Sequence, residues 1–151
     1  MEQVQQDTYN KPVVMVLSEH DSVLDTEQIK GIFNSRFTHP DSRLIWFGSE
    51  PSGIKGRIRF IHSRIPELRI STMSHMGILF SPENPYYGIH GSEKLCHNGQ
   101  DSSEAEGWCR QGKPTWYSAW GYQEPGKVHA RLTFNPFFNT MMDDIATTFQ
   151  Q

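Results

Sequence analysis

Two titratable residues, Asp21 and His75, each follow a stretch whose residue pattern predicts a β-strand. Asp21 comes after the apolar run PVVMVL (residues 12–17), and His75 comes after ELRISTM (residues 67–73). In α/β proteins, reactive side chains gather beyond the carboxyl ends of the strands. An aspartate there can orient a histidine by a hydrogen bond, and the histidine can take a proton from a nucleophile. The pattern therefore indicates an acid–base pair made of Asp21 and His75.

Each of these residues also has a simpler structural interpretation. An aspartate in a turn commonly hydrogen-bonds nearby backbone amides, and a single histidine at a strand end is often structural. Asp25 is the rival acid, but it stands at the start of a helical pattern and is expected to act as the helix N-cap. His20 and Glu19, beside Asp21, are expected to be surface residues of the same turn.

The elements around the pair predict an α/β layer architecture within one domain spanning residues 1–151. The run 12–17 is continuous and β-branched, which is typical of a strand buried on both sides. A helix is predicted from Asp25 to Phe37, because Asp25 can cap it and Pro40 stops it. The apolar stripe of this helix consists of Ile29, Ile32, Phe33 and Phe37.

Three further strands are predicted at residues 43–48, 57–62 and 67–73. In 57–62, apolar residues alternate with arginines, which predicts a half-exposed or edge strand. Residues 81–128 show no clear period and are interpreted as an insertion with its own tertiary contacts, a lid, or a partly disordered segment. A terminal helix is predicted at 135–149, with Asn135 and Pro136 at its start. Its apolar face consists of Phe138, Met142, Ile145 and Phe149, with Met141 beside them.

The composition of the 151-residue chain gives no indication of a nucleic-acid or membrane-surface partner. Its 14 basic and 17 acidic residues give a formal net charge of -3, and no strongly basic surface is expected. No apolar run approaches the roughly 18 residues that span a bilayer. The opening residues MEQVQQDTYN do not resemble a signal peptide, which favours a cytoplasmic location if Met1 is the native start.

Several stretches resemble the C-terminal part of the α/β-hydrolase family. PVVMVLSEHDSVLDT is similar to the strand and D-x-V turn that carry the triad acid, and LRISTMSHMGILFSPENPYYG is similar to the last strand and histidine loop. NPFFNTMMDDIATTF resembles the closing helix. The resemblance covers residues 11–88 and 134–149 and leaves 89–128 unexplained. It implies that Asp21 is the triad acid, that His75 is the triad base, and that the substrate is a small carboxylic ester or related acyl compound. It implies no cofactor and no metal.

The chain departs from this family in its nucleophile. The family order is Ser, then Asp or Glu, then His, with the serine in a G-x-S-x-G elbow, and this motif is absent from the sequence. Ser18 is the one serine before Asp21, and it lies at the end of the same predicted strand. We therefore expect the C-terminal portion of a larger serine hydrolase, inactive alone. A sheet cut at this point exposes a strand edge, which predicts a homodimer. The alternative is a complete, non-catalytic binding domain with a hydrolase-like shape.

Cys96, His97 and Cys109 leave three interpretations open. The cysteines can be two thiols or one disulfide that closes the segment between them, and a metal site is a weaker alternative. A metal-dependent enzyme would use His75, His90, Cys96 and His97. The aromatic residues of WYSAWGY (116–122) are expected to pack the insertion onto the sheet, and lining an acyl or sugar pocket is the alternative.

Overall fold

The computed structural model describes residues 8–150 and contains one mixed sheet flanked by helices. The sheet has the strand order β1-β2-β4-β3. Strands β1, β2 and β4 are parallel, and β3 runs antiparallel to β4 at the outer edge. Their bounds are β1 Val14–Ser18, β2 Arg43–Gly48, β3 Gly53–Lys55 and β4 Ile58–His62. The α/β class expected from the sequence is confirmed at this coarse level.

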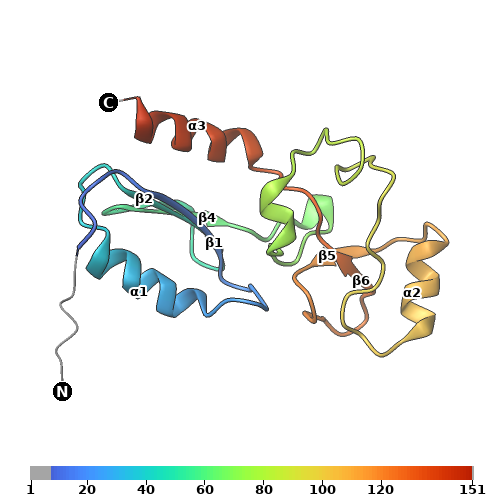
Figure 1. Ribbon diagram of the computed structural model, residues 1–151. Coiled ribbons are helices and arrows are strands. Elements are labelled where there is room, and N and C mark those ends of the chain that lie inside the picture. The colour runs from blue at the N-terminus through green and yellow to red at the C-terminus, as the bar shows by residue number, and fades with distance from the viewer. Residues whose placement is uncertain (1–7, 151) are drawn as a thin grey trace, which may run out of the picture.

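Two helices cover opposite faces of this sheet, α1 (Thr26–Arg36) and α3 (Phe138–Phe149) (Figure 1). Side chains alternate across a strand, so β2 supplies both layers. Leu44 and Trp46 pack with Phe33 of α1, whereas Ile45 and Phe47 pack with Met141 of α3. This double burial explains why β2 is almost wholly apolar. It also fixes the sheet as a rigid base for the loops at its carboxyl edge.

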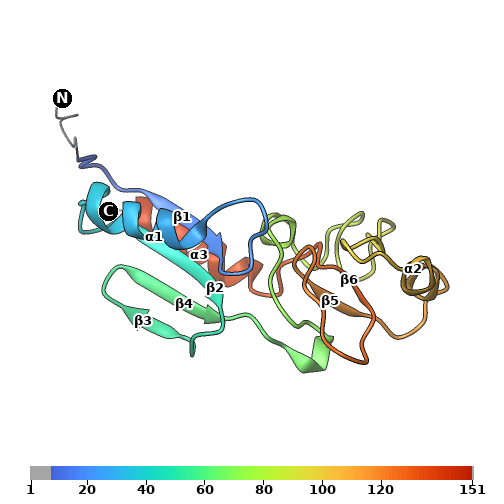
Figure 2. The same cartoon turned by 90° about the horizontal axis from the view of Figure 1, so that it is seen from below.

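The rest of the chain forms a second group of elements beyond that edge. It contains α2 (Ser103–Arg110) and a small parallel pair, β5 (Trp116–Ser118) with β6 (His129–Arg131). Figure 2 shows the arrowheads of the parallel strands directed toward this group. Residues 81–128, which show no period in the sequence, thus contribute α2 and β5 to it. No helix within residues 8–150 is both long and apolar enough to cross a membrane.

The strand predicted at 67–73 is wrong. Pro66–Leu68 form a short 3-10 helix, and Arg69 follows in the left-handed region with φ of 54°. Proline fixes φ and lacks an N–H, so the chain turns here instead of extending. Only isolated pairings of Ile70 with Ile65 and Tyr117 are formed within the described residues. A second 3-10 helix, Met76–Leu79, begins directly after His75.

The terminal helix begins at Phe138, three residues later than the predicted start at 135. Asn135 is fully buried, and its carboxamide donates to the Ile78 carbonyl and accepts from the Phe137 amide. It therefore organises the turn before the helix. The predicted face is also rotated, because Met141 is buried whereas Met142 and Phe149 are exposed.

Three other details of the predicted elements differ. β1 lies at the open edge of the sheet, although helices cover both of its faces, and its first residues are half-buried. β4 is half-exposed, as its alternating pattern predicts, but it is not an edge strand, because the short β3 pairs with its outer side. Ile32 of α1 is exposed and does not join the apolar stripe of that helix.

Candidate functional site

Asp21 lies in the turn that follows β1, at the carboxyl edge of the sheet. Its amide donates to the Ser18 carbonyl at 3.1 Å, which begins the turn. Its Oδ1 accepts from the amides of Val23 at 2.7 Å and Leu24 at 3.1 Å. Although the backbone turn leaves Asp21 partly exposed, its side chain is only 2% exposed. The turn role expected of an aspartate is therefore present, and it uses one carboxylate oxygen.

Two buried serines bring His75 to this turn. The Ser18 hydroxyl donates to the Met73 carbonyl at 2.8 Å and so attaches the 70–75 segment to the end of β1. The Ser74 hydroxyl donates to the Leu132 carbonyl and accepts from the Gly77 amide. These bonds connect the segment before His75 to β1 on one side and to the chain after β6 on the other. His75 itself precedes the 3-10 helix in a helical backbone conformation.

Asp21 and His75 form a short hydrogen bond. The His75 Nδ1 lies 2.5 Å from the second carboxylate oxygen, Oδ2, of Asp21. Burial alone would raise the pKa of Asp21, but hydrogen bonds from His75, Val23 and Leu24 hold it below its ordinary value. The carboxylate therefore stays ionised near neutral pH. A carboxylate at Nδ1 favours the tautomer with its proton on that nitrogen, which leaves Nε2 able to accept one.

A cleft of about 300 Å³ opens beside this pair. His75, whose side chain is 52% exposed, reaches it, whereas the Asp21 carboxylate lies behind the histidine. An exposed histidine ring backed by a buried carboxylate can move a proton to or from a bound molecule. The other side chains that line the cleft include Ser22, Val23, Met76, Trp120 and Arg131.

No serine or cysteine among residues 8–150 hydrogen-bonds the His75 ring. Ser74 lines the cleft, but its hydroxyl is committed to Leu132 and Gly77. Ser18 is fully buried and bonded to Met73. Ser22 also lines the cleft and makes no hydrogen bond to His75. The described part of the chain thus presents an acid and a base without an attached nucleophile.

A second serine–histidine contact lies elsewhere in the molecule, between Ser71 and His129. The Ser71 hydroxyl is 3.2 Å from the His129 Nε2. Both residues are only 3% exposed, so substrate cannot reach them. Burial also lowers the pKa of His129 and keeps its ring neutral. We therefore assign this contact to the packing of β6 and not to chemistry.

The rival acid and the residues beside Asp21 have structural positions. Asp25 caps α1, because its carboxylate accepts from the Gln28 amide at 3.0 Å, as expected. Glu19 accepts from both the amide and the hydroxyl of Ser49 and joins the ends of β1 and β2. His20 packs edge-on against Tyr122. None of these residues contacts His75 in the described part of the chain.

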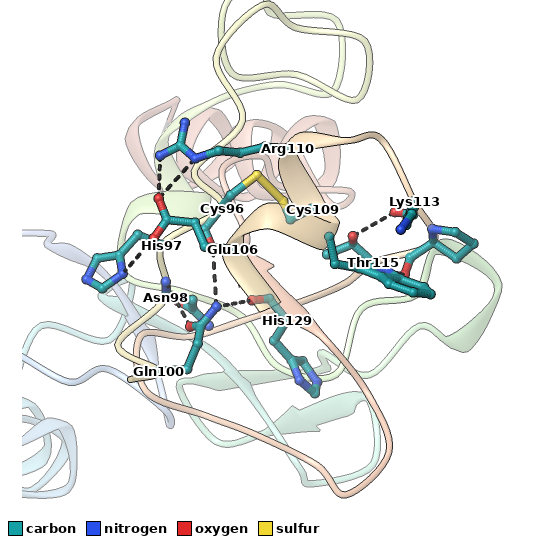
Figure 3. The surroundings of a disulfide bond; sticks show 12 residues. Cys96, His97, Asn98, Gln100, Glu106, Cys109, Arg110, Lys113, Thr115 and His129 are labelled. Carbon is teal, nitrogen blue, oxygen red and sulfur yellow. Dashed lines mark hydrogen bonds and ion pairs between the residues drawn. A yellow bond between two sulfur atoms is a disulfide. The ribbon is translucent and has the colours of Figure 1, made fainter. Parts of the chain in front are cut away.

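Cys96 and Cys109 form a disulfide (Figure 3). The bond joins the connection before α2 to the end of that helix, and both cysteines pack with Ala130 of β6 in one buried cluster. Close by, the Glu106 carboxylate lies between His97 and Arg110 (Figure 3). A disulfide sulfur is not a thiolate ligand, so the metal interpretation loses Cys96. No group of three metal-ligating side chains occurs within residues 8–150.

Sequence reasoning gave no role to Arg131 and treated the aromatic cluster as a single group. Tyr117 packs in the core, as expected of WYSAWGY, whereas Trp120 lines the cleft. The alternative interpretation of the aromatics, as pocket residues, therefore applies to Trp120. Arg131 has no motif around it, and only its position on β6 brings it to the cleft. Ser18 and Ser74 gave no sequence signal for their roles in positioning the pair.

Comparisons with known proteins give no information on this site, so its interpretation rests on its geometry. Searches against protein-family models, curated proteins and solved structures found no match to the chain. The polar opening stretch, on which the expected location depends, lies mostly in residues 1–7, outside the described residues. The comparisons and the structure together therefore establish a mixed α/β chain, and the family stays a prediction.

Proposed function

We propose that this chain carries the acid–base pair of a serine hydrolase that acts on carboxylic esters or related acyl bonds. The observation that carries the proposal is the Asp21–His75 hydrogen bond, with a buried acid and an exposed base. Its place at the carboxyl edge of a parallel sheet is where α/β enzymes assemble active sites. The order of acid before base along the chain also agrees with the α/β-hydrolase resemblance.

In the proposed reaction, His75 moves protons and Asp21 holds its ring. A serine hydroxyl attacks the acyl carbonyl while the His75 Nε2 takes the hydroxyl proton. The resulting imidazolium gives that proton to the departing alcohol, which leaves an acyl-serine. Water then attacks the acyl group by the same proton path, which releases the acid and restores the serine. Asp21 stabilises the imidazolium in both halves of the reaction without taking its proton.

The serine is proposed to come from a part of the parent protein outside these 151 residues. Because no hydroxyl or thiol within residues 8–150 bonds the His75 ring, the isolated chain is expected to be inactive. Hydrolysis of p-nitrophenyl acetate by the purified chain measures this. Activity that Ser22→Ala abolishes would contradict the proposal and identify Ser22 as the nucleophile.

The function itself is tested on the protein produced from its complete gene. We expect hydrolysis of short p-nitrophenyl esters that His75→Gln reduces by several orders of magnitude, because the base is lost. His90→Gln is the matched control, since His90 is exposed and does not line the cleft. Equal activity of the wild type and His75→Gln would refute the proposed role of His75.

The absence of a nucleophile at His75 within the described residues favours one second candidate, a non-catalytic binding domain. Such a domain would keep the cleft and bind a small ligand without turning it over. A complete gene product that binds ester analogues and hydrolyses none of them would support this candidate over the enzyme.

A further inference from the structure

Arg131 is a half-buried cation in the His75 cleft that lacks an ionic partner among the described residues. It lines the same cleft as His75, and it forms no salt bridge within residues 8–150. Its Nε is buried without a hydrogen-bond partner. Removing a guanidinium from water without pairing it costs free energy, and this burial lowers the pKa of Arg131. An acceptor on a ligand that reaches the guanidinium through the cleft would recover part of that cost.

The surroundings hold Arg131 in place. Its amide donates to the Leu95 carbonyl at 3.0 Å, and it pairs with Ser118 in the β5–β6 ladder. The guanidinium carbon lies 4.3 Å from the centre of the Trp120 ring. An aromatic face orients a planar guanidinium and leaves its N–H edge open for a planar acceptor. The preceding residue on the strand, Ala130, packs against the disulfide, which further restrains the strand.

Arg131 is the one permanently charged side chain among the described residues that line the cleft. No carboxylate is among the residues of the described range 8–150 that line it. The nearby Asp21 carboxylate is engaged by His75, Val23 and Leu24. One guanidinium matches one monoanion, and its fork geometry matches a carboxylate. A phosphate dianion would call for additional cations that this cleft does not supply.

We propose that Arg131, oriented by Trp120, binds a carboxylate of the substrate, so that the site selects esters that carry a negative charge away from the scissile bond. The term substrate rests on the proposed hydrolase function, but the anion site itself does not. The cleft of about 300 Å³ has room for a small acyl group together with this carboxylate.

The test measures binding and needs no nucleophile. The 151-residue chain is titrated with monomethyl succinate, which is charged, and with dimethyl succinate, which is neutral, at one fixed ionic strength. Chemical shifts of the Trp120 indole N–H and the Arg131 Nε–H give the two dissociation constants. We expect the charged ester to bind about tenfold tighter, the effect of one charge-assisted hydrogen bond. Equal affinities, or no shift of the Arg131 signal, would overturn the proposal.

Variants separate this site from general charge effects. Arg131→Met keeps an unbranched side chain but removes the charge and should abolish the preference, whereas Arg131→Lys should keep part of it. Lys55→Gln removes one exposed positive charge on β3 and should leave the preference unchanged. A preference that survives Arg131→Met in a folded protein would overturn the proposal. His75→Gln should leave anion binding intact while it stops hydrolysis by the complete protein. The anion site at Arg131 and the hydrolase function can therefore be refuted independently of each other.

Discussion

The two oxygens of the Asp21 carboxylate serve different purposes. Oδ1 accepts backbone amides and fixes the turn, and Oδ2 accepts from His75. The turn interpretation and the acid interpretation of Asp21 are therefore compatible. A carboxylate that is already fixed by its own backbone holds the imidazole with little further loss of conformational freedom. This geometry is the reason to place Asp21, and not Asp25, beside the base.

Asp21→Asn tests this assignment at a single residue. An amide can offer its N–H to the His75 Nδ1 and so stabilise the wrong tautomer, which in a serine protease costs roughly 10⁴-fold in kcat. We expect a loss of that order for ester hydrolysis by the complete protein. In the isolated chain, we expect the downfield His75 Nδ1–H resonance to disappear from the NMR spectrum.

Asp25→Asn is the control, because asparagine caps a helix about as well as aspartate. It should change neither the resonance nor the activity. If Asp25→Asn lowers activity as much as Asp21→Asn, the acid has been assigned to the wrong residue.

At the scale of elements, two attachments restrain the β5–β6 group, one within the group and one that joins it to the sheet. One is the Cys96–Cys109 disulfide, which closes the connection around α2. The other is Glu124, whose side chain is 16% exposed and accepts from Arg64 and Lys127. Arg64 lies two residues after the end of β4, so this ion pair joins the sheet to the 118–127 turn. Both attachments restrain the strand that carries Arg131.

Replacing both cysteines by serine should destabilise the fold. The sulfurs are separated by 13 residues in the sequence, and closing a loop of that size contributes about 3 kcal/mol in the chain-entropy model. Urea unfolding of the double variant should show a lower midpoint than the oxidised wild type. Reduction of the wild type should produce a similar decrease. An unchanged urea midpoint in both experiments would contradict the prediction and show that the disulfide does not stabilise the fold.

Glu124 should make the free energy of unfolding depend on pH. Hydrogen bonds from Arg64 and then Lys127 lower the pKa of Glu124 far below its ordinary 4.5, which it regains when the chain unfolds. As the pH falls, Glu124 therefore takes up a proton in the unfolded state before it does so in the folded state. The contribution of the Glu124 charge to the stability of the folded state is present above about pH 4.5, and it is lost as the pH falls toward the lowered pKa of the folded state.

Urea unfolding of Glu124→Gln between pH 7 and pH 3 measures this contribution. The variant should be less stable at pH 7, and its difference from the wild type should narrow on acidification. Glu67→Gln, at an exposed carboxylate, should show no such trend. A difference that stays constant with pH would contradict the role of the Glu124 charge.

At the scale of the whole molecule, the three parallel strands and the Asp21–His75 contact could be predicted, whereas β3 and the cleft could not. The apolar runs at 12–17 and 43–48 follow from burial on two faces, which leaves a direct pattern in the sequence. His75 lies at the predicted edge of the sheet although the strand predicted before it does not form. The reason is that the hydroxyls of Ser18 and Ser74 attach the segment before His75 to this edge. β5 and β6 have three residues each, too few for a period. Their pairing, and with it the place of Arg131, depends on tertiary contacts.

The open edge of β1 predicts self-association of the isolated chain. Val13 and Glu19 bond to β2, so alternation directs the amides of Val14 and Val16 away from it. Unpaired strand edges pair with other chains. Val14→Pro removes one outward amide and should reduce dimer formation, whereas Val14→Ala keeps that amide and should not. Light scattering after size exclusion gives the mass, and a monodisperse wild-type monomer would contradict the prediction.

Labelling with a fluorophosphonate tests the central claim most directly, because this probe reacts with a serine that a histidine base activates. The complete gene product is treated with the probe, and mass spectrometry locates the adduct. We predict a single adduct on a serine outside the 151 residues, formed rapidly in the wild type and in His90→Gln but not in Asp21→Asn or His75→Gln. An adduct that forms equally fast without His75, or no adduct on the folded protein, would contradict the account.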